Sequence, residues 1–156
     1  MVCMGPRTSI ARLAVWVWFC VALAAPAWAA LGQRVTSVEA DRRQMRGTVR
    51  VEQRQAYAMH EIRAASGVVV REYVSPAGWV FAVAWQGRVM PDLVQLLGAS
   101  YPAYRKALAA APRRRGPLVL RSGGLVVQLG GRMRAHSGRA WLMGLLPANV
   151  SAEVIR

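Results

Sequence analysis

The chain of 156 residues carries a formal net charge of +14 at pH 7, from 21 lysines and arginines against 7 aspartates and glutamates. Its length fits one domain. Because Cys3 and Cys20 both lie near the N-terminus, the rest of the chain cannot be a disulfide scaffold. The basic excess predicts attraction to anionic partners, although the same charge can simply be solvated.

The N-terminal residues have the order of a secretory signal peptide. Arg7 and Arg12 precede a short apolar run that Pro26 breaks. Ala27-Trp28-Ala29 then supplies small residues at both ends of a cleavage site. A positive start, an apolar core and a small-residue site in this order are typical of exported proteins. We therefore expect residues 1–29 to be a signal peptide.

Cleavage after Ala29 would leave residues 30–156 as a single domain, exported to the periplasm or the extracellular space. Because no second long apolar segment follows, we expect no transmembrane segment in this domain. An alternative stays open: without cleavage, the apolar run extends to Leu31 and would be retained as a membrane anchor.

Residues 35–45 predict a short helix. Thr36 or Ser37 is expected to cap its N-terminus. Glu39 and Asp41 suit its first turn, where acidic groups interact favourably with the helix dipole. The arginines that follow leave this helix little apolar face.

The next part of the chain predicts a three-stranded antiparallel meander. Residues 57–64 alternate in polarity, residues 68–74 are rich in β-branched side chains, and residues 79–85 alternate large and small side chains. Gly67 supplies a positive φ in the first turn. Ser75-Pro76-Ala77-Gly78 matches a type I turn.

Charge complementarity selects a register for this meander. A three-residue first loop places Glu61 opposite Arg71 and His60 opposite Glu72. A two-residue loop would instead place Glu61 opposite Glu72, and like charges directly opposite each other are destabilising. We therefore prefer the first register, in which the second turn places Glu72 opposite Phe81.

This register gives the meander one apolar face and one mixed face. The apolar face is expected to be the core, and it carries Ile62, Val68, Val70, Val74, Trp79, Phe81, Val83 and Trp85. The mixed face carries Glu61, Arg71 and Tyr73 beside small residues, and we expect it to be partly solvated.

The C-terminal half predicts a broken helix followed by short strands. Pro91 and Asp92 are start signals for a helix that Gly98 ends or kinks, and Pro102 restarts it. Strands are predicted over residues 118–121, 125–129, 132–135 and 139–143, with turns at 122–124 and 130–131 and a candidate edge strand at 150–155.

Together these elements predict an α+β domain: a mostly antiparallel sheet, made of a three-stranded meander and C-terminal hairpins, with an inserted broken helix. The runs VREYVSPAGWVFAVAWQG (70–87) and PDLVQLLG (91–98) resemble a bacterial exported family known as domain of unknown function 2844. The ALGQ that follows the cleavage site and the later GRAW (138–141) also fit. This resemblance implies export and a one-domain architecture, and it brings no activity, cofactor or catalytic residue.

His60 and Glu72 are the candidate catalytic residues, because the predicted register sets them opposite each other on the apolar face. Burial would lower the pKa of the histidine and raise that of the glutamate, and their mutual attraction would do the opposite. Such a pair can act as a general acid and base, although it more often only satisfies two buried polar groups.

Metal and cofactor sites are not indicated. His60-Glu61 opens an H-E-x-x-H pattern, but Ala64 stands where the second histidine is required. His136 is the remaining histidine, and two histidines without cysteine are a poor ligand set. The glycine pairs lack the spacing of a phosphate-binding loop. We expect no metal and no cofactor, and the sequence leans away from an enzyme.

Aromatic and arginine side chains are the candidate ligand-binding residues. Trp79 and Trp85 could line a groove with arginines at its rim, although aromatics at strand spacing more often belong to a core. Arg113, Arg114 and Arg115 lie in an exposed loop bounded by prolines.

The lead hypothesis is a non-enzymatic envelope protein that binds an anionic envelope lipid or polymer through its arginines. Export argues against nucleic acid as the anionic partner. Two alternatives stay open. One is a ligand-binding or catalytic pocket around His60 and Glu72. The other is an accessory protein that pairs with another envelope protein through a sheet edge.

Overall fold

The computed structural model describes residues 31–112 and 116–156. The predicted signal peptide and the loop arginines 113–115 lie outside the described residues. The elements in chain order are α1 (Thr36–Gln44), β1 (Thr48–Gln53), β2 (Ala58–Arg63), β3 (Val69–Val74), β4 (Val80–Gly87), α2 (Leu93–Leu97), η1 (Gly98–Ser100), α3 (Tyr101–Ala110), β5 (Leu118–Ser122), β6 (Leu125–Arg132), β7 (Ala135–Leu142) and η2 (Ala152–Val154).

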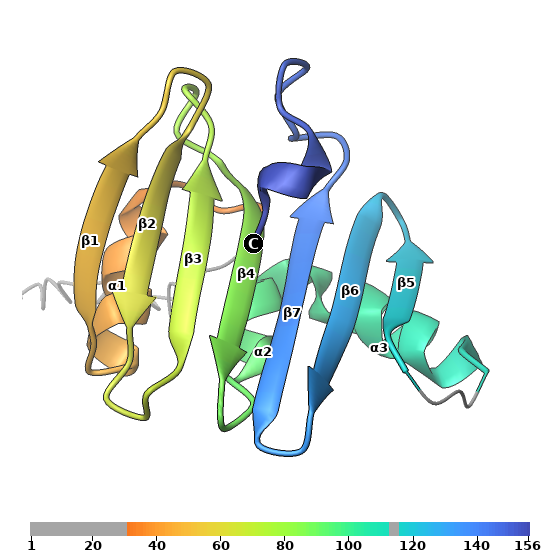
Figure 1. The fold of residues 1–156 in the computed structure, drawn as a ribbon. Coiled ribbons are helices and arrows are strands. Elements are labelled where there is room, and N and C mark those ends of the chain that lie inside the picture. Colours follow the sequence, from red (N-terminus) through yellow and green to blue (C-terminus); the bar gives the residue numbers. More distant parts are fainter. Residues whose placement is uncertain (1–30, 113–115) are drawn as a thin grey trace, which may run out of the picture.

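The strands form one seven-stranded antiparallel sheet in the order β1-β2-β3-β4-β7-β6-β5 (Figure 1). The sheet consists of two halves, each formed by a continuous part of the sequence. Helix α1 is followed by the meander β1 to β4, and the broken helix α2-η1-α3 is followed by the meander β5 to β7. The halves meet at the centre, where β4 pairs with β7. This confirms the predicted α+β class, its antiparallel sheet and its inserted broken helix.

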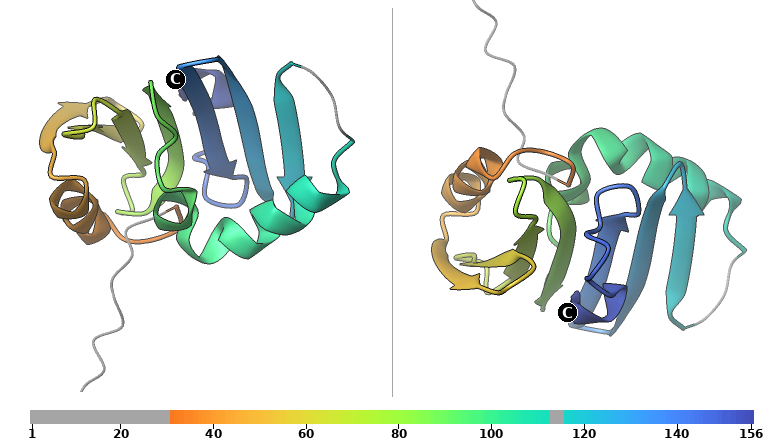
Figure 2. Two further views of the ribbon diagram at one scale, coloured as in Figure 1. Left: turned by 90° about the horizontal axis from the view of Figure 1, so that it is seen from below. Right: turned by 90° about the horizontal axis from the view of Figure 1, so that it is seen from above.

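The helices cover one face of the sheet, and the C-terminal segment covers part of the other (Figure 2). Between helices and sheet lies a core that includes Val38 of α1, Ile62 of β2, Trp85 of β4 and Leu96 of α2. None of the helices within residues 31–112 and 116–156 reaches the length and hydropathy that a membrane span requires.

The face expected to be partly solvated is instead a second core. Tyr73 and Phe81 are buried there with Trp141 of β7, under Val150 and Ile155 of the C-terminal segment. The tail was therefore wrongly predicted as an edge strand. It forms the single turn η2 and lies on the sheet because Ile155, which has no exposed surface, needs apolar side chains to pack against.

The predicted β2–β3 register is confirmed, with Glu61 opposite Arg71 and His60 opposite Glu72. The predicted β3–β4 register is wrong: Glu72 lies opposite Val83 rather than Phe81. A bulge near Val74 inserts an extra residue in β4. It turns Phe81 away from the helices, and the ring contacts Tyr57 and Tyr73 on the opposite face.

The helix prediction at 35–45 is confirmed as α1, but its cap is not. Neither Thr36 nor Ser37 caps through its side chain: the N-cap is Val35, and the Ser37 hydroxyl donates to the Arg34 carbonyl at 2.7 Å. The start of α2 lies two residues later than predicted: Pro91 precedes the helix, and Asp92 is its N-cap, whose carboxylate accepts hydrogen bonds from two backbone N–H groups.

The C-terminal hairpins differ from prediction in one place. Residues 130–131 lie within β6 rather than in a turn, and the predicted strand 132–135 is broken by the true turn at Met133 and Arg134. Gly131 is needed for a close approach: a Cβ there would lie 2.2 Å from the Ala135 carbonyl oxygen.

Candidate functional site

Three elements bring a buried polar cluster together beneath the sheet. Asp41 of α1, Glu72 of β3 and Gln95 of α2 are 0%, 0% and 3% exposed. The Gln95 side-chain amide donates a hydrogen bond to one oxygen of Asp41. Neither Glu72 oxygen accepts a hydrogen bond from an amide, an alcohol or a cationic side chain within the described residues, and the polar group that faces it is the carboxyl of Asp41.

Such a pair of carboxyl groups cannot ionise fully in an apolar interior. Burial, and then the neighbouring charge of Asp41, raise the pKa of Glu72 well above its ordinary value. Burial also raises the pKa of Asp41, against the hydrogen bonds from Glu72 and Gln95. The pair therefore keeps a proton to higher pH than ordinary carboxyl groups do, and a protonated Glu72 can donate to the Asp41 carboxylate.

His60 lies opposite Glu72 in the ladder, but it is not the partner of the acid. No hydrogen bond or ion pair joins the two side chains in the described part of the chain. Burial alone lowers the pKa of His60, which favours the neutral imidazole. Since Glu72 and Asp41 have no exposed surface, a substrate cannot reach either carboxyl in this conformation.

The two tryptophans proposed as groove walls stand apart. Trp79 lies at the turn before β4, where the Arg34 guanidinium stacks over its ring at 4.2 Å. Trp85 is near the other end of β4 and only 2% exposed. Six residues of extended strand separate them by about 20 Å, so they do not share one groove.

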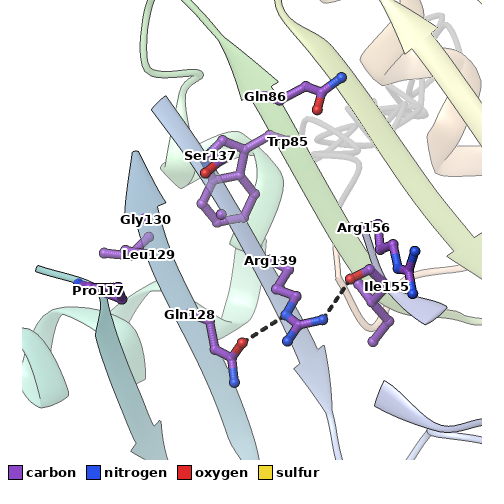
Figure 3. A pocket seen from close by; sticks show the side chains of 11 residues that line it. Trp85, Gln86, Pro117, Gln128, Leu129, Gly130, Ser137, Arg139, Ile155 and Arg156 are labelled. Atoms are coloured by element: carbon purple, nitrogen blue, oxygen red, sulfur yellow. Dashed lines mark hydrogen bonds between the residues drawn. The ribbon is translucent and has the colours of Figure 1, made fainter. Parts of the chain in front are cut away.

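A pocket of about 330 Å³ lies between the C-terminal segment and the strands β4, β6 and β7 (Figure 3). Its lining includes Trp85, Gln128, Arg139 and Ile155. Arg139 donates to the Gln128 side chain at 2.7 Å and to the Ile155 carbonyl at 2.9 Å. The N–H groups of Arg139 are thus already used in hydrogen bonds to Gln128 and to the C-terminal segment, so this guanidinium is not free to bind an anionic ligand in the pocket.

The acidic residues leave much of the positive charge uncompensated. Asp41 and Glu72 are buried together, and Asp92 caps α2. Each of the three glutamates that make ion pairs binds two arginines: Glu39 binds Arg42 and Arg43, Glu52 binds Arg50 and Arg54, and Glu61 binds Arg63 and Arg71.

The remaining cations have no ion pair within the described residues: Arg34, Arg46, Arg88, Arg105, Lys106, Arg121, Arg132, Arg134, Arg139 and Arg156. Most of these side chains belong to exposed residues. The sequence showed the excess of arginine and predicted Arg113, Arg114 and Arg115 as binding residues, but these three lie outside the described residues. The sequence did not predict that Asp41 would be buried beside Glu72. The one feature that pointed to an unusual environment was that the predicted helix around Asp41 has little apolar face.

Within residues 31–112 and 116–156, no group of three or more histidine, cysteine, aspartate or glutamate side chains lies close enough to hold a metal ion. The described residues thus form an α+β fold with a buried pair of carboxyl groups in its core and an arginine-rich surface. The chain belongs to the family described as protein of unknown function (DUF2844), whose model matches residues 27–155. No curated protein and no solved structure matches the chain.

Proposed function

We propose that this protein is an exported, non-catalytic envelope domain that binds an anionic envelope component through its arginine-rich surface. The observation that carries the proposal is the distribution of charge. Two of the acids lie in the core, where they cannot neutralise the surface, while many arginines stay exposed without an acidic partner. A surface of one sign attracts ligands of the other sign over several ångströms of solvent.

Export is supported by the order of the N-terminal sequence and by the contacts of the residues that follow the proposed cleavage site. Leu31 is 1% exposed, and its N–H donates to the Leu96 carbonyl. Gly32 donates to the Val80 carbonyl. Removal of residues 1–29 would leave both of these contacts in place, and the family match starts close to the proposed cleavage site, at residue 27.

Binding would be tested by co-sedimentation with dextran sulfate, lipopolysaccharide and phosphatidylglycerol vesicles, with neutral dextran and phosphatidylcholine vesicles as controls. Because the screening length falls from about 10 Å at 0.1 M salt to about 3 Å at 1 M, binding to the anionic probes should weaken steeply as salt is added. Equal binding at both salt concentrations, or no binding to any anionic probe at low salt, would refute the proposal.

Export would be tested by fusing the full chain to alkaline phosphatase, which becomes active only after it leaves the cytoplasm. The expected result is an active fusion that becomes inactive when Arg7, Arg12 and the apolar run are deleted. Mass spectrometry of the exported protein should find Ala30 as its first residue. A fusion that stays inactive would contradict export, and an intact N-terminus would support the retained anchor instead.

The open sheet edges favour a second candidate, an accessory protein that pairs with a partner strand. Strands β1 and β5 each have one neighbour in the sheet, so their outer backbone groups are free to pair within the described fold. Cross-linking in cells would capture such a partner. The pocket hypothesis at His60 and Glu72 is tested separately, since His60→Ala should leave anionic binding unchanged under the charge proposal.

A further inference from the structure

Two loops at one end of the sheet lie side by side. The first follows β4 and contains Arg88, Val89 and Met90. The second is the turn between β6 and β7, formed by Arg132, Met133 and Arg134. Gly87 at the end of β4 pairs with His136 at the start of β7, which sets the two loops against each other at the lower edge of the sheet (Figure 1). We call these six residues the basic tip.

Each loop of the basic tip exposes large apolar side chains next to arginine. Met133 is 91% exposed, Val89 50% and Met90 45%. The arginines beside them, Arg88 and Arg132, are exposed as well. Large apolar side chains that are this exposed and lie in neighbouring loops are a feature of interaction surfaces.

Acidic side chains do not compensate the basic tip. Its three arginines make no ion pair with any residue in the described ranges. The nearest acid along the chain is Asp92, and its carboxylate accepts hydrogen bonds from Val94 and Gln95 at the start of α2. A surface that combines apolar tips with unneutralised arginines is complementary to anionic headgroups above hydrocarbon.

The backbone of the second loop departs from what stability alone would favour. Arg134 has φ +63°, in the left-handed region where glycine is the preferred residue. Glycine is used at neighbouring position 131, where φ is +121°. An arginine at 134 therefore costs backbone energy, and it keeps a cation beside Met133.

We propose that the basic tip is a membrane-docking site that inserts Met133, Val89 and Met90 into the headgroup region of an anionic phospholipid bilayer. This inference rests on the proposed function and names its surface and its partner. The exposed apolar side chains select a bilayer over an acidic polymer, because a polymer offers arginine a counter-charge but offers methionine no apolar phase. Docking would set the strands upright on the membrane, with η2 at the end facing away (Figure 1).

Vesicle flotation with the exported protein, purified after removal of the proposed signal peptide, tests the site. Vesicles of phosphatidylglycerol mixed with phosphatidylcholine would be compared with phosphatidylcholine alone. Met133→Ser should weaken binding to the anionic vesicles about tenfold, as expected when one buried apolar side chain is lost, and the double variant Val89→Ser/Met90→Ser, which removes two, should weaken it at least as much. Replacing Arg88, Arg132 and Arg134 by glutamine should weaken it about a hundredfold, at about fivefold per arginine.

Matched variants away from the basic tip serve as controls. Met143→Ser removes a methionine that is 53% exposed beyond the other end of β7. A triple variant with Arg105, Lys106 and Arg121 changed to glutamine removes the same charge from α3 and β5. Both controls should bind as the native protein does, and unchanged thermal unfolding would show that all variants are folded.

Quenching of tryptophan fluorescence by brominated lipids measures whether the basic tip inserts into the bilayer. Met133→Trp and Met143→Trp place one added indole at each end of the sheet, over the same background of native tryptophans. Phospholipids with brominated chains should quench Met133→Trp more strongly. Equal quenching would overturn insertion.

The outcomes separate this inference from the proposed function. If tip and control variants lose vesicle binding equally, or if tip variants keep it, the basic tip is not the docking site. If native binding to lipopolysaccharide or dextran sulfate stays salt-sensitive, such a vesicle result overturns the docking site alone and leaves the proposed function standing. Absence of binding to every anionic probe at low salt would overturn both.

Discussion

Replacing Glu72 by glutamine should stabilise the folded domain increasingly as the pH rises. In the unfolded chain this carboxyl loses its proton near the ordinary value of 4.5. In the folded protein, burial and Asp41 hold its pKa well above that value. Between the two pKa values the folded state binds a proton that the unfolded state has released, so native stability falls as the pH increases.

The size of this effect follows from proton linkage. Each pH unit between the two pKa values removes about 1.4 kcal/mol from the unfolding free energy of the native protein. Glutamine does not titrate, and its amide can still donate to Asp41. The stability difference between Glu72→Gln and the native protein should therefore grow with that slope above pH 4.5, the ordinary pKa of the side chain.

Urea unfolding followed by tryptophan fluorescence, from about pH 5 to about pH 8, measures both proteins. Taking the difference removes the contributions of the groups that do not interact with Glu72, so that only Glu72 and its partner Asp41 contribute. Glu61→Gln is the matched control on the next strand. Burial would raise the pKa of Glu61, but hydrogen bonds from Arg71 and Arg63 hold it below its ordinary value. Its stabilisation is present above the unfolded-state pKa and lost as the pH falls through the folded value.

Glu61→Gln should therefore destabilise the protein at neutral pH, with the effect fading in acid. A constant difference between Glu72→Gln and the native protein over the whole pH range would refute the reasoning. It would mean that Glu72 ionises in the folded state as it does in the unfolded chain.

Three further substitutions test the packing. Gly138→Ala would place a Cβ 2.3 Å from the Trp85 ring, and the unfolding free energy should fall by about 1–3 kcal/mol in urea titrations. Arg139→Gln removes the hydrogen bond of 2.9 Å to the Ile155 carbonyl; it should cost about 2 kcal/mol and speed amide exchange in the C-terminal segment. Asp92→Ala removes the cap of α2 and should cost about 1 kcal/mol by thermal unfolding.

Each of these three substitutions has a control variant. Gly130→Ala, where the nearest atom is the Ser137 hydroxyl at 3.5 Å, should be tolerated if close approach to Trp85 is what requires glycine at 138. Arg121→Gln removes an exposed arginine from β5 and should leave amide exchange of the C-terminal segment unchanged. Asp92→Asn keeps a capping oxygen, and a loss as large as that of alanine would contradict the capping role.

The β2–β3 hairpin could be predicted because its charges distinguish the possible registers. Glu61 lies opposite Arg71 in one register and opposite Glu72 in the other, and local electrostatics decides between them. The β3–β4 register could not be predicted in this way. Its bulge turns Phe81 toward Tyr57, an aromatic contact across strands that no local pattern contains.

Strand β1 was missed because it has little of the usual strand signature. Five of its six residues are exposed, so both faces tolerate polar side chains, and pairing with β2 holds it in place. The C-terminal segment was misassigned for a related reason. Its apolar residues Val150 and Ile155 predict burial, but the surface that buries them is assembled from strands far away in the sequence.

The candidate site was predictable only in part. The ladder position of His60 beside Glu72 follows from the hairpin. The partner that matters to Glu72 is Asp41, and that contact depends on how α1 docks against the sheet. The basic tip depends on a β4–β7 pairing between the two halves, which brings together arginines that are distant along the chain.

The central position of β4 also sets the order in which the protein can fold. Its residues Val80–Trp85 are all buried, yet one edge of the strand stays unpaired until β7 has been synthesised, after both helices and two more strands. Contacts so distant in sequence form slowly. We therefore expect the buried strand β4 to stay without its partner strand β7 while the rest of the chain emerges. For a chain that we propose to be exported, this delay would extend the time in which it stays unfolded enough to be threaded across a membrane.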